Sequence, residues 1–323
     1  MKGRWKLHVR MWIASIIMFV LLYVIFSMVG TALGLNTGPI FYLIITIVIT
    51  IIQFISGPKL VEKSMRVRRV SPGEYPELHQ MVEELAQKAG IPTPTIGISD
   101  TSVPNAFAYG RSTKDGHVAV TRGILGILTY DELKAVLGHE ISHIKHHDSA
   151  IQTIVSVIPV VCYYLALATI FSGNNRDNGA NAIIGIVGLL FYFVGQLLVL
   201  FISRIREYYA DEGSVELGCK PEHLASALYK LVYGAANAPE SQIKEIQGSK
   251  AFFLNDVSNA GNDITDLSQL DLNSDGVIAA DELKVILNSN IKTSSSAKFM
   301  ELISTHPNML KRIKKLAELQ ENY

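Results

Sequence analysis

The sequence GHEISH at residues 138–143 decides how this chain is interpreted, because it contains an H-E-x-x-H motif. Residues at i and i+4 of a helix share one face, so His139 and His143 can offer imidazole nitrogens to one metal ion. Glu140 lies beside them, where a carboxylate can take a proton from the attacking water. The motif is short enough to arise by coincidence, so the rest of the chain has to support it.

The residues on both sides of the motif predict that it lies on a helix. Thr129-Tyr130-Asp131-Glu132 matches a capping box, the pattern that starts many helices. A stripe of apolar side chains follows at helical spacing: Leu133, Leu137, Ile141 and Ile144. After the motif, His146, His147 and Asp148 are interpreted as solvated residues at the helix end, where imidazoles are favourable. Ligands to an additional metal are the alternative.

A catalytic zinc ion of this type takes three protein ligands and leaves one position for water. The motif variant with a third histidine needs Gly at 146 and His at 149, but the chain has His146 and Ser149. A downstream carboxylate remains, and Glu207 is the candidate, within the sequence SRIREYYAD at residues 203–211. On a helix, Asp211 lies one turn beyond Glu207 and could accept the other ring N–H of a ligand histidine.

These motifs resemble those of the HtpX family of integral-membrane zinc proteases, which is related to the CAAX prenyl endopeptidases. HEISH, the downstream REYYAD and the sequence THPNMLKRI at residues 305–313 occur in the family's order. The sequence PNAFA at residues 104–108 matches as well, so the resemblance covers most of the chain.

The resemblance implies roles for individual residues. It makes His139, His143 and Glu207 the zinc ligands, Glu140 the general base and Asp211 a partner of a ligand histidine. It implies that an edge strand pairs with the substrate backbone, through Asn105, Ala106, Phe107 and Ala108. It also brings His306 and Arg312 close to the active site, where His306 would be catalytic and Arg312 would bind substrate.

The composition predicts a membrane protein. Of 323 residues, 49% are hydrophobic and only 18% are charged, below the roughly 25% that is typical of soluble domains. Lys+Arg and Asp+Glu both number 29, so a nucleic-acid partner has no electrostatic support. Cys162 lies in an apolar run and Cys219 in a polar segment, so no disulfide is expected.

Four apolar runs approach or exceed the roughly 20 residues that a membrane-spanning helix needs. They are residues 11–33, 39–55, 151–171 and 183–202. Basic residues flank the outer ends of the first two runs and are absent between them, so the positive-inside rule places those ends in the cytoplasm. The last run returns to Arg204 and Arg206, which brings His139 and Glu207 to the same cytoplasmic face. The alternatives are a signal peptide for the first run and buried core helices for the last two.

The runs divide the chain into two transmembrane hairpins and a protease domain in two parts. The hairpins are residues 1–57 and 151–202, and the two parts of the protease domain are residues 58–150 and 203–323. Within the first part, the pattern predicts a helix at 74–89 and strands at 95–99, 105–109 and 117–121. Another helix is expected from Lys220, with Pro221 in its first turn.

Residues 271–282 match a calcium-binding EF-hand loop, inside an insert at about 260–290 that departs from the HtpX pattern. The predicted ligands are Asp271, Asn273, Asp275, the carbonyl of Val277, and Glu282. Gly276 permits the sharp turn in the middle of such a loop. A surface loop rich in Asp, Asn and Gly is the alternative interpretation.

The expected fold is an α-helical multi-pass membrane protein with a cytoplasmic α+β gluzincin-type metalloprotease domain. The expected function is zinc-dependent hydrolysis of misfolded or damaged membrane proteins in the cell membrane. One catalytic Zn²⁺ is expected, with Ca²⁺ at the EF-hand-like loop and modulation by calcium as a hypothesis. The alternatives are a CAAX-type prenyl-protein endopeptidase and a non-catalytic calcium-binding membrane protein with a structural zinc site.

Overall fold

A computed structural model describes residues 39–148, 178–236, 269–273, 275–288 and 304–321, with isolated positions within 16–34, 159–167, 264–267 and 301–302. By their internal contacts the residues form two units. The first comprises Met1–Gly57 and Ala150–Ile202, and the second comprises Pro58–Ser149 and Ser203–Tyr323.

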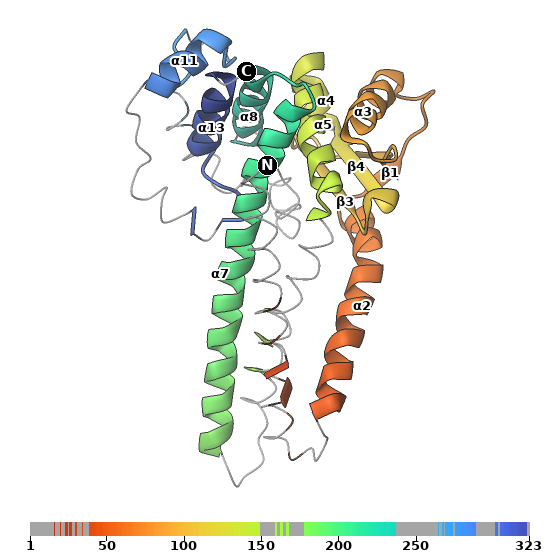
Figure 1. Cartoon of the computed structure of the whole chain (residues 1–323), viewed down its shortest axis with the longest axis vertical. Helices are drawn as coiled ribbons and strands as arrows, with labels where there is room; N and C mark the ends of the chain where they lie inside the picture. The colour runs from red at the N-terminus through yellow and green to blue at the C-terminus, as the bar shows by residue number, and fades with distance from the viewer. Residues whose placement is uncertain are drawn as a thin grey trace. The chain divides into compact units, whose positions relative to one another are not determined.

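The first unit contains the apolar parts of two long helices, α2 (Pro39–Ser64) and α7 (Asn178–Glu216) (Figure 1). Each has a stretch long and apolar enough to cross a membrane, Ile44–Ser64 in α2 and Ile183–Glu216 in α7. Large apolar side chains are exposed along them, including Ile51 and Leu190, as lipid-facing side chains would be. Both helices continue beyond the predicted runs 39–55 and 183–202. The predicted runs 11–33 and 151–171 fall largely outside the described residues.

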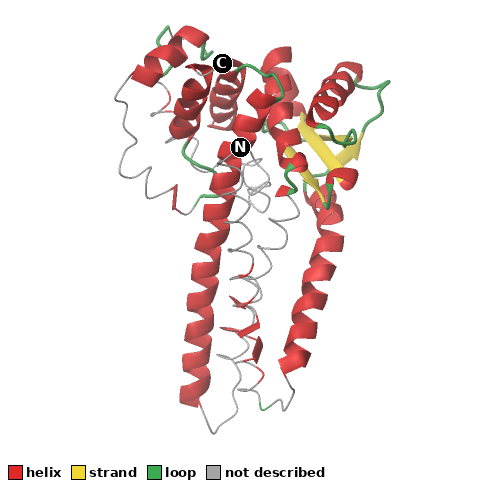
Figure 2. Cartoon of the chain, in the orientation of Figure 1, coloured by secondary structure: helices red, strands yellow, loops and turns green. Residues whose placement is uncertain are grey.

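A four-stranded mixed sheet lies in the second unit (Figure 2). Its strands are β1 (Val67–Arg69), β2 (Thr95–Ser99), β3 (Ala106–Gly110) and β4 (Gly116–Thr121), in the spatial order β1-β2-β4-β3. β2 and β4 are parallel, and the other two pairs are antiparallel. β3 is therefore an edge strand. The predicted strands are confirmed to within one residue, whereas the three-residue β1 was too short to be predicted.

Four helices and this sheet together form the core of the second unit. The helices are α3 (Pro76–Ala89), α4 (Arg122–Ile127), α5 (Tyr130–Lys145) and α8 (Pro221–Ala236), and a 3₁₀ turn, η1 (Thr113–Asp115), joins β3 to β4. α5 packs against α3, α8 and β3, and Figure 1 shows it between α3 and α8. Leu137 and Ile141 of α5 are fully buried, which confirms the predicted apolar stripe, and Leu224 and Leu228 of α8 are fully buried as well.

The C-terminal part of the second unit adds α11 (Ala280–Asn288) and α13 (Met309–Glu321). α13 packs against both α8 and α11. The arrangement connects the EF-hand-like loop, which precedes α11, to the helix that carries Arg312. Cys162 and Cys219 are free thiols, as expected.

Candidate metal centre

The H-E-x-x-H motif lies on α5, whose start is the predicted capping box. The Glu132 backbone N–H donates to Thr129 Oγ1 (3.4 Å), and the Thr129 N–H donates to Glu132 Oε2 (2.8 Å). The same glutamate binds α8, because Ser226 Oγ donates to its Oε1 (2.6 Å) and Lys230 Nζ to its Oε2 (2.9 Å). Glu132 thus fixes both the start of α5 and its contact with the neighbouring helix.

Small residues allow α7 to approach α5 closely. A β-carbon on Gly138 would lie 2.9 Å from Ser214 Oγ, and one on Gly213 would lie 2.7 Å from the Ser142 β-carbon. Ser214 Oγ also donates a 2.7 Å hydrogen bond to the Ala135 carbonyl on α5. This close approach brings the carboxylates of α7 to the histidine face of α5.

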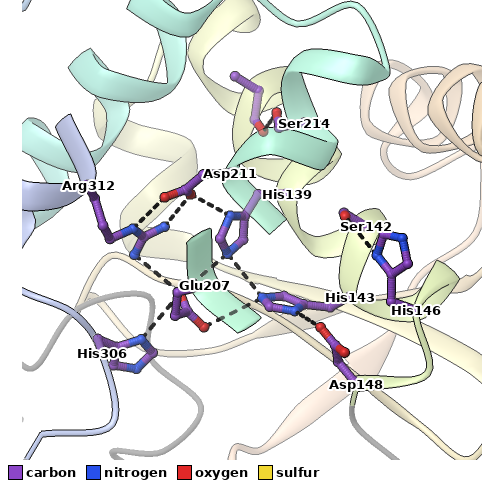
Figure 3. Close-up of polar contacts among 11 residues, drawn as sticks. His139, Ser142, His143, His146, Asp148, Glu207, Asp211, Ser214, His306 and Arg312 are labelled. Atoms are coloured by element: carbon purple, nitrogen blue, oxygen red, sulfur yellow. Dashed lines mark hydrogen bonds and ion pairs between the residues drawn. The ribbon is translucent and has the colours of Figure 1, made fainter. Parts of the chain in front are cut away.

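The three predicted ligands meet in a buried cluster (Figure 3). The Nε2 atoms of His139 and His143 are 3.1 Å apart. Glu207 Oε2 lies 3.5 Å from His139 Nε2, and Glu207 Oε1 lies 3.6 Å from His143 Nε2. Within the part of the chain that the structure describes, this is the one group of three whose ligand atoms all lie within 4.8 Å of one another.

Asp211 holds the ring of His139, as its position one turn beyond Glu207 predicted. Its Oδ1 lies 2.9 Å from His139 Nδ1. Arg312 then holds Asp211 with two hydrogen bonds, from Nε (2.9 Å) and Nη2 (2.7 Å), while its Nη1 lies 3.3 Å from Glu207 Oε2. Arg312 is fully buried, so these contacts place its guanidinium behind the ligands.

Asp148 holds the ring of His143 in the same way, a role that was not predicted from the sequence. Its Oδ2 lies 2.7 Å from His143 Nδ1, and its Oδ1 lies 3.3 Å from Arg206 Nε. The interpretation of Asp148 as a solvated residue at the helix end is therefore wrong, since it is 4% exposed. His147, with a positive φ of 59°, turns the chain back after α5 and brings Asp148 against the His143 ring.

His306 reaches the cluster from the segment before α13. Its ring is buried, and its Nδ1 lies 3.4 Å from Glu207 Oε2 (Figure 3). Among the described residues, neither ring nitrogen of His306 has a hydrogen-bond partner. The ring can therefore offer a hydrogen bond to a group that enters the site.

Glu140 lies on the same helix as the two histidines and is buried. Burial raises the pKa of its carboxyl and the charge of Glu207 adds to this, while His139, His143 and a backbone hydrogen bond from Ala108 act in the opposite direction. The net shift is upward. A carboxylate with a raised pKa is a better proton acceptor, as a general base requires. The Ala108 contact also shows that β3 adjoins this carboxylate.

Charged neighbours decide the protonation of the buried groups around the cluster. Burial by itself would lower the pKa of His139, but the carboxylates of Asp211 and Glu207 beside its ring raise it to about 9. Burial would likewise raise the pKa of Asp148, but the charge of Arg206 and the hydrogen bond from His143 lower it. Both aspartates adjoining the histidines thus have a cationic partner that keeps a buried carboxylate ionised.

Four of the five residues predicted to bind substrate lie at the edge of the sheet, whereas the fifth, Arg312, is fully buried beside Asp211. Asn105 precedes β3 and is buried, and its backbone N–H donates to Thr121 Oγ1 (2.8 Å). Its carbonyl accepts from the Thr121 backbone N–H (2.9 Å). Ala106, Phe107 and Ala108 follow within β3, where they pair with β4 on one side. In the described structure, the other side of β3 has no strand beside it.

The EF-hand-like loop folds around two buried carboxylates. Asp271 accepts hydrogen bonds from the backbone N–H groups of Asp275 and Gly276 and from the Tyr229 hydroxyl of α8. Glu282, the last position of the loop, reaches back to the Leu272 N–H (2.8 Å) and also accepts from the Ala279 N–H. Gly276 has a positive φ of 81°, as the pattern requires.

The other predicted calcium ligands do not point to a common centre. Asn273 and Asp275 are exposed and bind each other through Asn273 Nδ2 and Asp275 Oδ2 (2.9 Å). Val277 donates its N–H to Asp275 Oδ1 (2.8 Å). Among the described residues, no three carboxylates of this loop have oxygen atoms that all lie within 4.8 Å of one another, as the ligand atoms of the histidine cluster do.

Comparisons with known proteins agree with this arrangement. Residues 72–320 match peptidase family M48. A "Protease HtpX homolog" of Methanothermobacter thermautotrophicus is 55% identical over 71% of this chain and 86% of its own length. Another, of Thermoplasma volcanium, is 33% identical over 96% of this chain and 91% of its own length.

Comparison with solved structures also finds a similar fold. The crystal structure of S. mikatae Ste24p covers 95% of this chain and 67% of its own chain, with a TM-score of 0.50. The sequence identity is 16%, so this likeness concerns the fold alone.

Proposed function

The chain belongs to peptidase family M48, and from that premise we propose that it is a membrane-embedded zinc endopeptidase. One observation carries the proposal: two histidines of an H-E-x-x-H helix and a glutamate of a second helix converge in a buried cluster. Imidazole nitrogens and one carboxylate are a donor set that suits catalytic Zn²⁺. Glu207 Oε2 is buried, and the nearest nitrogens of Arg312, His306 and His139 lie 3.3 Å, 3.4 Å and 3.5 Å from it, longer than a normal hydrogen bond, which leaves this oxygen available to a cation.

His139, His143 and Glu207 would hold the Zn²⁺. When bound, the ion supplies Lewis-acid chemistry, which polarises the scissile carbonyl and lowers the pKa of a water molecule. Glu140 takes the proton from the attacking water and delivers it to the leaving amine. His306 donates a hydrogen bond to the oxyanion that develops on the carbonyl. Arg312 and Asp211 keep the His139 ring in place.

The substrate backbone adds to β3 as an extended strand, on the side that faces away from β4. Main-chain hydrogen bonds along an edge strand bind a peptide with little dependence on its sequence. The contact between Ala108 and Glu140 supports this assignment, because it joins the edge strand to the general base. Asn105 fixes the start of the strand through its two backbone hydrogen bonds to Thr121.

The protein has four membrane spans, with both termini and the active site in the cytoplasm. Two candidate spans lie within the described residues, and the positive charge that flanks the outer ends of the first two runs supports this orientation. Substrates that expose backbone near the cytoplasmic surface suit such an enzyme. Misfolded or damaged membrane proteins expose backbone in this way and are therefore the proposed substrates.

The loop at residues 271–282 binds Ca²⁺. The position-by-position match to the EF-hand pattern supports this, as do the left-handed Gly276 and the return of Glu282 to the start of the loop. Since α11 packs against α13, calcium would order the segment that carries His306 and Arg312. Peptidase activity would then rise with calcium.

The test is peptidase activity of the detergent-purified chain on casein, with zinc-loaded wild type beside Glu140→Gln. We expect Glu140→Gln to bind zinc normally and to lose about 10²- to 10⁴-fold in kcat, the usual contribution of a general base. Glu83→Gln, which changes an exposed carboxylate of α3, serves as the control and keeps wild-type activity. A fully active Glu140→Gln protein would refute the base assignment, and cleavage that survives a zinc chelator would refute the metal.

A further inference from the structure

The two histidines of the metal centre are held by separate but similar sets of contacts, and Figure 3 shows the aspartate beside each ring. Each histidine contacts a buried aspartate through Nδ1, and each aspartate is paired with a buried arginine. The set around His143 consists of Asp148 and Arg206, and the mechanism proposed above uses neither of them. Their geometry nevertheless determines which nitrogen of His143 faces the centre.

A carboxylate at Nδ1 fixes both the tautomer and the orientation of an imidazole. Asp148 Oδ2, at 2.7 Å, accepts the Nδ1–H of His143, so the lone pair of the neutral ring lies on Nε2. That Nε2 is the atom that faces His139 and Glu207, at 3.1 Å and 3.6 Å. The Asp148 contact therefore presents the ligand nitrogen to the metal position.

Arg206 in turn fixes Asp148. The ion pair between Arg206 Nε and Asp148 Oδ1 measures 3.3 Å, and both side chains are less than a tenth exposed. A buried carboxylate needs such a partner to stay ionised. Asp148 directly precedes segment 149–205 and Arg206 directly follows it. This segment contains residues 150–202 of the first unit. The ion pair joins the two ends of this segment beside a metal ligand.

We propose that Asp148 and Arg206 are positioning residues for the metal centre. Their ion pair holds His143 in place and thereby sets the affinity of the centre for zinc. This inference rests on the proposed zinc site. It predicts a ranking: loss of Asp148 weakens zinc binding most, and loss of Arg206 weakens it less, because Arg206 reaches His143 through Asp148.

The test measures Zn²⁺ affinity of the full chain in detergent by competition with a chromophoric chelator, and the absorption spectrum with Co²⁺ in place of zinc. Asp148→Ala should bind zinc about 10- to 100-fold more weakly, the usual effect of losing such a partner, and should change the Co²⁺ spectrum. Asp148→Asn keeps the shape of the side chain and one acceptor oxygen, so it should lose less zinc affinity than Asp148→Ala. Arg206→Met should lower the affinity, and Arg206→Lys should restore part of it.

Glu132→Gln is the matched control, because Glu132 is another buried carboxylate with a cationic partner, Lys230, but it does not touch a predicted ligand. It should lower the melting temperature and leave zinc affinity and the Co²⁺ spectrum unchanged. The inference is overturned if Asp148→Ala and Arg206→Met match wild type in both measurements, or if Glu132→Gln loses as much affinity as Asp148→Ala. If Asp148→Ala does not fold, Asp148→Asn decides by the same criteria. A wild-type chain that binds no zinc would instead overturn the zinc site itself.

Discussion

Gly213 of α7 faces Ser142 of α5 so closely that a β-carbon on Gly213 would lie 2.7 Å from the β-carbon of Ser142. Carbon atoms in contact are normally about 3.5–4.0 Å apart, so the two helices can keep this spacing only if residue 213 has no side chain. His139 lies on one of these helices and Glu207 on the other. The spacing between the helices therefore decides whether the ligand atoms meet.

Gly213→Ala should push α7 away from α5. We expect a loss of about 1–3 kcal/mol in the free energy of unfolding, typical of overpacking, together with weaker zinc binding. Thermal unfolding in detergent and zinc competition measure the two effects. Gly126→Ala in α4 is the control, because a β-carbon there meets no atom within 4 Å, and it should not lower stability. Wild-type stability and zinc affinity in Gly213→Ala would contradict the close-approach argument.

Arg312→Gln should be among the most damaging single changes in the second unit. It leaves Asp211 without two hydrogen bonds and Glu207 without a nearby cation, in a fully buried position. Removing one partner of a buried ion pair costs about 3–5 kcal/mol. Chemical or thermal unfolding should show this loss, and zinc affinity should fall with it. Arg111→Gln breaks the more exposed pair with Asp115 and should change stability by less than about 1 kcal/mol.

Glu132 should make a pH-dependent contribution to stability. Burial by itself would raise its pKa, but hydrogen bonds from Lys230, Ser226 and Thr129 lower it below the ordinary value. Since the folded-state pKa is lowered, the stabilisation is present above the unfolded pKa of about 4.3 and is lost as the pH falls through the folded value.

We therefore expect Glu132→Gln to cost about 2 kcal/mol at pH 7, as hydrogen bonds to a charged group typically contribute. The difference in melting temperature from wild type should shrink as the pH is lowered below about 4. A difference that stays constant from pH 7 to pH 3 would show that the charge of Glu132 does not contribute.

Calcium should raise the melting temperature of the chain. An ion that binds only the folded state at 100 times its Kd stabilises it by about 2.7 kcal/mol. Glu282→Gln removes one of the carboxylate oxygens expected to bind calcium and should abolish the shift. Asp281→Asn, at the exposed neighbouring position on α11, should keep it. No calcium-dependent shift in wild type, or an equal shift in Glu282→Gln, would count against the loop as a calcium site.

Much of the metal centre could be predicted because it follows from local helical spacing. His139 and His143 share a face of α5, and Glu207 and Asp211 repeat that spacing on α7. The capping box around Thr129 also depends only on neighbouring residues, and it appears in the structure as predicted. Patterns of this kind are visible in a single sequence since they depend on the period of the helix.

The missed residues depend on tertiary structure. Asp148 contacts His143 only because His147 adopts a left-handed conformation, which the sequence does not indicate since residue 147 is not a glycine. Arg206 was interpreted as a charge that flanks a membrane span, but it is buried against Asp148. The need for glycine at position 213 is equally invisible, because it arises from the contact between two helices.

The order in which the ribosome makes the chain has a consequence for when the enzyme becomes active. Arg312 follows Asp211 by 101 residues, and His306 belongs to the same late segment. When α7 has just left the ribosome, the nascent chain already contains both histidines and Glu207. It still lacks Arg312, whose guanidinium balances the charges of the buried Asp211 and Glu207. The complete centre can form only after the ribosome has passed Arg312, so we expect the chain to have no protease activity during most of its own synthesis.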